Sequence, residues 1–211
     1  MKGLMFTFIV LCVGSGYLFS QDLNRKSINL QANTSVNGNI FFLETLCYEK
    51  GINIKIKVKD SISMNTLRLD STYNRLMNSI NKITFDPKND SLMNLFKKAD
   101  SAIKVHTVYS IDSVYVAYNQ FPQYRKLLND LFNSSPVKLE NNAYNRNRII
   151  LDGTQMEFKL LQDDATLFTA YAHSPTKLSH PLLYEFITAT LGIYRSERLN
   201  AFLTEERTSG Y

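Results

Sequence analysis

Two histidines bracket one short loop late in the chain, and their spacing makes them the first candidates for chemistry. His173 ends an apolar run, and His180 directly precedes Pro181, which is expected to open a helix. The first turn of a helix exposes unpaired backbone N–H groups, so it can hold an anion. The candidate ligand-binding residues are therefore His173, Ser174, Lys177, Ser179 and His180. Ordinary helix capping by the same residues is the simpler alternative.

The sequence patterns that accompany common enzyme chemistry are missing. There is no His-Glu-x-x-His, no Cys-x-x-Cys, no Gly-x-Ser-x-Gly and no glycine-rich phosphate motif. His106 is the third histidine, but its separation from the other two is not one that defines a metal shell. We therefore expect no catalytic residue, no metal site and no cofactor, and we expect that the protein is not an enzyme.

Residues 1–20 predict an export signal. Lys2 is followed by an uncharged, mostly apolar run over residues 4–13, and small residues at Gly16 and Ser20 offer two cleavage points. An uncleaved anchor and a lipoprotein are the alternatives, although residues 4–19 are shorter than the ~20 that span a bilayer. We expect a periplasmic, cell-surface or secreted protein. The chain has a formal net charge of +5, which loses one unit with the signal.

Removal of the signal leaves Cys47 as the single cysteine. Residues 40–50 are expected to form a helix that ends at Gly51, with Leu43, Leu46 and Cys47 on its apolar face. A buried thiol is the preferred interpretation. An intermolecular disulfide and a nucleophile paired with a histidine are the alternatives.

The first half of the chain predicts alternating helices and strands. Residues 21–39 are polar and are expected to form a flexible leader. Residues 52–59 alternate between apolar and polar, as a half-buried strand does. Helices are expected after Asp70, after Asn89 or Asp90, and from Pro122, with strand-forming residues between 105 and 118.

The second half predicts a three-strand antiparallel meander over residues 148–172. Asp152-Gly153 is expected to form its first hairpin turn. An amphipathic helix is expected over residues 181–203, followed by a frayed tail at 204–211. Because no apolar run reads as a strand buried on both faces, the predicted fold class is α+β, with one domain over residues 40–203.

Three lysines, Lys55, Lys57 and Lys59, fall on one side of the strand predicted at 52–59. Such a row can meet phosphate or an acidic glycan. An exposed sheet face, or an edge protected from pairing, is the preferred explanation.

These observations favour a small exported α+β protein that acts as a non-catalytic binding or envelope-associated module. The expected partner is a protein, an anionic envelope component or a small ligand. Nucleic acid is not expected, because the chain is expected to be exported and has no dense basic stripe. No membrane span is expected once the signal is removed, and the oligomeric state does not follow from the sequence. The alternatives are a hydrolase using a histidine of the 173–180 loop, with or without Cys47, and a secreted effector or inhibitor acting through protein contacts.

Overall fold

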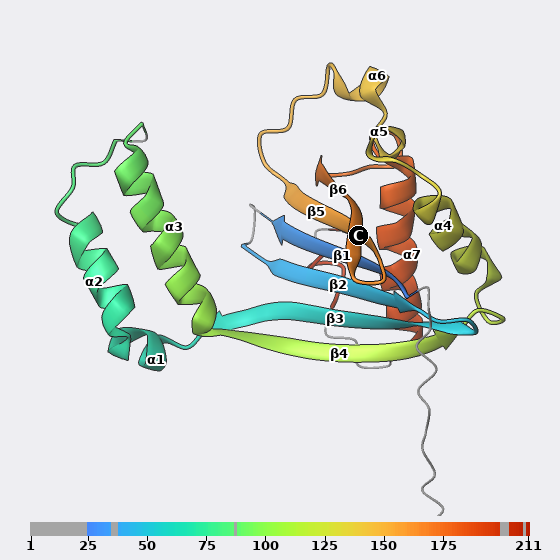
Figure 1. Cartoon of the computed structure of the whole chain (residues 1–211), viewed down its shortest axis with the longest axis horizontal. Coiled ribbons are helices and arrows are strands. Elements are labelled where there is room, and N and C mark those ends of the chain that lie inside the picture. The colour runs from blue at the N-terminus through green and yellow to red at the C-terminus, as the bar shows by residue number, and fades with distance from the viewer. Residues whose placement is uncertain (1–24, 35–37, 87, 199–202, 209) are drawn as a thin grey trace, which may run out of the picture.

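The computed structural model describes residues 25–34, 38–86, 88–198, 203–208 and 210–211 (Figure 1). The predicted signal at residues 1–20 lies outside this range. The fold is mixed α+β and is built on a single antiparallel sheet of six strands, in the order β4-β3-β2-β1-β5-β6. The strands are β1 Lys26–Thr34, β2 Ile40–Cys47, β3 Gly51–Ile62, β4 Thr107–Ala117, β5 Thr154–Gln162 and β6 Ala165–His173. No helix within the described ranges is long and apolar enough to cross a membrane.

The flexible leader predicted at residues 21–39 is wrong for most of its length, because β1 is an inner strand paired with both β2 and β5. Ile28, Leu30 and Ala32 are buried on one face, while asparagine and glutamine alternate with them on the other. Those amides made the segment look like a polar linker. The period-2 pattern of a half-buried strand was nevertheless present.

The helix predicted at residues 40–50 is a strand instead. Phe41, Leu43 and Thr45 are buried with period 2, and β2 pairs with β1 and β3 along its length. A short apolar run suits a helix or a strand, and periodicity alone does not separate them. Pairing with two neighbouring strands decides the outcome here.

The predicted three-strand meander is reduced to the hairpin of β5 and β6, which extends the same sheet. Residues 148–151 form no strand, and Asp152-Gly153 is not the hairpin turn. The chain turns at Asp163-Asp164, whose φ angles of 51° and 64° place both residues in the left-handed region that a type I′ turn requires. Aspartate tolerates that region better than most residues with a side chain do.

Two helices cover one face of the sheet. They are α7 Pro181–Glu197 and α4 Pro122–Phe132, both with proline in the first turn as predicted. The apolar face of α7 is fully buried against the sheet, and the Tyr124 hydroxyl lies 2.7 Å from the Thr190 hydroxyl, joining the two helices. The last helix was predicted to reach residue 203, but α7 ends at Glu197, because Arg198 already has an extended backbone.

The strands β3 and β4 extend past β2 and carry a separate group of helices (Figure 1). These are α1 Met64–Leu69, α2 Ser71–Ile80 and α3 Asp90–Val105, with a small core of their own around Ile80, Leu92 and Ala99. Asp70 and Asn89 accept hydrogen bonds from the first turns of α2 and α3, as their sequence positions predict.

The tail predicted to fray at 204–211 is packed instead. The Arg195 guanidinium on α7 donates to the Leu203 carbonyl at 3.0 Å, the Thr208 hydroxyl at 2.9 Å and the Tyr211 backbone oxygen at 2.8 Å. Leu203 and Thr208 are fully buried. The many charges of this segment suggested solvation, but the side chain that orders it belongs to another element.

The short helices α5 Pro136–Leu139 and α6 Asn142–Asn145 lie in the connection between α4 and β5. The buried Leu139 of α5 joins the main core. This connection also reaches the loop that follows β6, because Asn141 N–H donates to the Ser179 carbonyl at 2.8 Å.

Candidate functional site

The second face of the sheet is open to solvent, and this open face is the candidate site. The strand register arranges its side chains in rows that cross the sheet. One row runs Ser113, Lys55, Glu44, Asn29, Lys159, Thr169, and the next runs Ile111, Lys57, Phe42, Gln31, Glu157, Tyr171. Amide, charged and aromatic side chains from six strands therefore share one surface.

Two adjoining hollows lie on the open face. One, of about 460 Å³, lies over β1, β5 and β6 and includes Asn33, Gln155, Tyr171 and His173. The other, of about 360 Å³, lies over β1, β2, β3 and β5 and includes Asn29, Phe42 and Lys55. Gln31 and Glu157 line both hollows, so the two form one depression that crosses five strands.

Ion pairs hold several of these side chains in place. Lys55 Nζ lies 3.3 Å from Glu44, and Lys159 Nζ lies 2.9 Å from Glu157. The Tyr171 hydroxyl donates to the same Glu157 carboxylate at 3.3 Å. These pairs are solvent-exposed and add little to stability. They fix where the charges stand at the surface.

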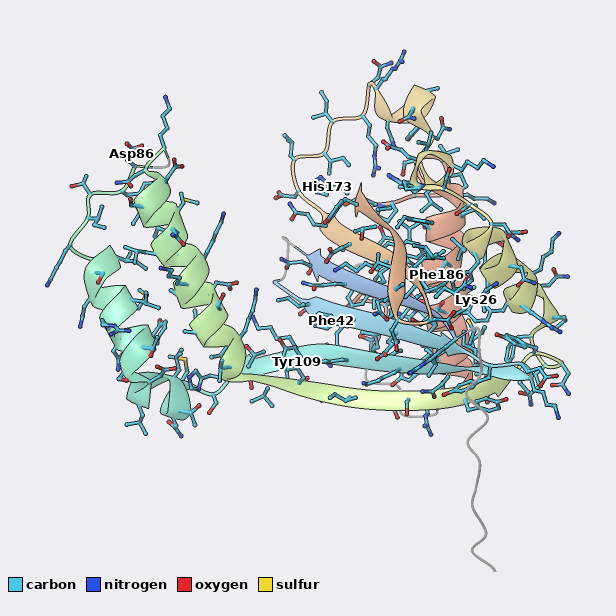
Figure 2. All side chains as sticks on the ribbon, viewed as in Figure 1. Lys26, Phe42, Asp86, Tyr109, His173 and Phe186 are labelled. Atoms are coloured by element: carbon cyan, nitrogen blue, oxygen red, sulfur yellow. The ribbon has the colours of Figure 1, made fainter. Side chains whose placement is uncertain are left out.

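Lys57 is held differently, by aromatic rings. Its ammonium lies 3.9 Å from the ring centroid of Tyr109 and 5.3 Å from that of Phe42, and the two rings meet edge to face. Figure 2 labels both rings, on β4 and β2, at the ends of these strands that lie toward the helical group. Within the described residues Lys57 belongs to no ion pair, in contrast to Lys55 and Lys159.

Asn29 lies in the middle of the open face, between Glu44 and Lys159. Its side-chain oxygen is buried and has no hydrogen-bond partner among the described residues. An unpaired buried polar atom costs about 1–3 kcal/mol.

The loop residues predicted as a ligand site do not come together in one cavity. His173 lines the larger hollow, at the end of β6 (Figure 2). Lys177 is exposed, while Ser179 and His180 are buried. The Ser174 hydroxyl accepts from Thr154 N–H at 2.9 Å, and Ser179 bonds with Thr176 inside the loop.

Contacts from two segments, the connection between α4 and β5 and the C-terminal segment, hold this loop in place. Arg148 donates to the carbonyls of His173 and Ser174, Asn141 N–H donates to the Ser179 carbonyl, and the Tyr211 hydroxyl donates to the Pro175 carbonyl at 2.8 Å. Burial lowers the pKa of His180, partly opposed by Glu140. The loop is therefore a structural junction, and His173 alone of the five predicted residues faces the candidate site.

His106, the remaining histidine, bonds to Asp70 at 2.8 Å and to the Thr66 hydroxyl at 3.0 Å. Thr66, His106 and Asp70 are thus linked in the order of a nucleophile, a base and an acid. However, the Thr66 hydroxyl donates to the Ser63 carbonyl, and the second Asp70 oxygen caps α2. His106 lowers the pKa of Asp70. The contacts tie α1, α2 and α3 together, and in the described ranges no cluster of metal-ligating side chains occurs.

Cys47 is too far from His173 to be activated by it. Cys47 pairs with Lys26 at one end of β1, whereas His173 pairs with Gln155, which pairs with Asn33 at the other end. Seven residues of strand separate the two positions, about 23 Å at ~3.3 Å per residue. They also lie on opposite faces of the sheet. Burial raises the pKa of the Cys47 thiol to about 11, which the Tyr118 hydroxyl and Lys26 only partly offset.

Cys47 is therefore expected to resist thiol labelling. With its pKa near 11, far less thiolate is present at neutral pH than for an unperturbed thiol, and the thiolate is the reactive form. The test uses protein that lacks residues 1–20 and a chromogenic disulfide at pH 7.5. The folded protein should react at least about 50-fold more slowly than the same protein unfolded in urea. Labelling at equal rates in the two states would contradict the protection of this partly buried thiol.

Sequence reasoning missed most of this face. It identified the lysine row of β3, but Asn29, Gln31, Asn33 and Phe42 lay in segments assigned to a leader and a helix. The signal that would have found them is the alternation of amides with apolar residues from Ile28 to Asn33.

Comparison of the chain with known protein families, with characterised proteins and with solved structures finds no match. The geometry of the open face is accordingly the basis for any functional conclusion.

Proposed function

We propose that this chain is an exported, non-catalytic binding module whose ligand site is the open face of the sheet. The observation that carries the proposal is the depression crossing five strands, lined by amide, charged and aromatic side chains. On the opposite face, the same strands bury an apolar core under α4 and α7. The polar side chains of the open face take no part in that core, and a recognition surface accounts for their make-up.

The site chemistry supports binding over catalysis. The carboxylates nearest the hollows, Glu44 and Glu157, are each engaged by a lysine. The histidine that reaches the depression, His173, is separated from the one thiol of the described residues by the length of β1. A hydrolase of the 173–180 loop and Cys47 therefore has no geometric support.

The binding site is tested by mapping backbone amide shifts in the ¹⁵N-labelled protein recovered after expression of the full chain. The probes are inorganic phosphate, vesicles of phosphatidylglycerol and phosphatidylcholine, hexaglutamate, and two tetrasaccharides, one acidic and one neutral. We expect at least one probe to shift amides of β1 and β5 around Gln31 and Glu157. Gln31→Ala should weaken that binding about tenfold, the effect of one or two hydrogen bonds.

Gln123→Ala is the matched control. Gln123 lines a different, largely apolar hollow between α4 and α7, so its replacement should leave the affinity unchanged. Shifts confined to that hollow, or no shift with any probe, would overturn the assignment to the open face.

Export is a separate part of the proposal and has its own test. The apolar run after Lys2 supports it. Expression of the full chain in a Gram-negative host should yield periplasmic protein whose first residue is Tyr17 or Gln21. Sequencing of the N-terminus measures this directly, and cytoplasmic protein that retains Met1 would contradict it.

A further inference from the structure

The depression on the open face suits an extended ligand. Adjacent strands lie about 4.8 Å apart, so the five strands from β3 to β6 span about 19 Å. Gln31, Asn33, Gln155 and Tyr171 are exposed along this path. A compact small-molecule site would enclose most of its ligand, whereas this surface contacts a ligand from one side.

The side chains along the path match the groups of a sugar. Asn29, Gln31, Asn33 and Gln155 each carry an amide with both a donor and an acceptor, which suits neighbouring hydroxyl groups. Tyr171, which is 74% exposed, offers a ring against which the apolar side of a pyranose packs. A bound peptide would more readily pair with a sheet edge, or require an apolar anchor at the centre of the face.

The charges of the face favour an anion. This side of the sheet carries four lysines and two glutamates, an excess of two positive charges. They are Lys55, Lys57, Lys59 and Lys159, and Glu44 and Glu157. Lys55 and Lys159 are already paired with the glutamates. The ammonium of Lys57, held by the rings of Phe42 and Tyr109, is the cation best placed to receive a carboxylate.

We infer that the ligand of the open face is an anionic oligosaccharide, a chain of carboxylate-bearing sugar units, which lies across the strands from Lys57 on β3 to His173 on β6. The inference deepens the proposed binding function and rests on it. The carboxylate of one unit meets Lys57, the hydroxyls of the next units bond to the β1 and β5 amides, and one sugar ring packs on Tyr171.

The test compares β-1,4-linked tetraglucuronate with cellotetraose, which has the same linkage and lacks the carboxylates. Binding to the protein recovered from expression of the full chain is measured by calorimetry and by amide shifts. We expect tetraglucuronate to bind on β1, β3 and β5, at least tenfold tighter than cellotetraose, with affinity falling as salt is raised.

Lys57→Met, which keeps the length of the side chain and removes its charge, should weaken tetraglucuronate binding at least tenfold and leave cellotetraose unaffected. Lys177→Met is the matched control, because Lys177 is exposed outside the depression, and it should change neither affinity. If Lys57→Met does not fold, Tyr171→Ala gives an independent reading at an exposed position, with an expected loss of at least fivefold.

Three other results are possible, and each overturns a different part of the inference or of the proposed function. Equal affinity for the two tetrasaccharides overturns the anionic assignment. Binding of hexaglutamate, phosphate or vesicles at the open-face amides without a response to either tetrasaccharide overturns the oligosaccharide and leaves the binding face standing. No response of these amides to any probe overturns both the inference and the proposed function.

Discussion

Replacement of Phe186 with alanine is expected to lower the free energy of unfolding by about 3–5 kcal/mol, the usual cost of removing a large buried aromatic side chain. Phe186 on α7 is fully buried, and its ring lies edge to face with that of Phe158 on β5 at a centroid distance of 5.7 Å. Figure 2 labels it on the helix that covers the sheet. Chemical denaturation followed by circular dichroism measures the loss.

Phe85→Ala provides the control for this variant. Phe85 is 68% exposed and lies between α2 and α3, so the same substitution should cost less than about 0.5 kcal/mol there. A loss below about 1 kcal/mol for Phe186→Ala would mean that α7 does not pack on the sheet as described.

Replacement of Arg195 with methionine is expected to release the C-terminal segment and to cost about 2–3 kcal/mol. Methionine keeps most of the apolar stem but removes the three hydrogen bonds to Leu203, Thr208 and Tyr211. Hydrogen bonds from a charged donor contribute about 1.5–3 kcal/mol each, and the freedom regained by the segment offsets part of that sum. Denaturation measures the stability, and the rate of carboxypeptidase digestion measures the release.

Arg146→Met is the matched control, since Arg146 is exposed in the connection that contains α6. It should change neither the stability nor the rate of digestion. A carboxypeptidase rate that is already fast in the unmodified protein would show that residues 204–211 fray in solution, as their sequence suggested.

Features that depend on local chemistry were predictable. The caps at Asp70 and Asn89, the proline-initiated helices α4 and α7, and the alternating strand around Ile54 each follow from a few neighbouring residues. A cap or an amphipathic period is set by side chains within one or two turns, so reading along the chain detects it.

Features that depend on pairing were not predictable in the same way. By its sequence alone, the segment of β1 resembles a polar linker and that of β2 resembles a helix. Both are strands because β1 pairs with β2 and β5, and β2 pairs with β1 and β3. Asp152-Gly153 has stronger turn chemistry than Asp163-Asp164, yet the hairpin forms at the second pair because the register of β5 and β6 places it there.

The sequence by itself determined the α+β class, the starts of α2, α3, α4 and α7, the lysine-bearing face of β3 and the absence of familiar catalytic motifs. Only the tertiary structure decided that Cys47 and His173 lie at opposite ends of the sheet, that the 173–180 loop is a structural junction, and that the open face is one surface. The physical reason is the geometry of an antiparallel sheet. A row across its strands brings together side chains such as Lys57, Gln31 and Tyr171, which no spacing along the chain relates.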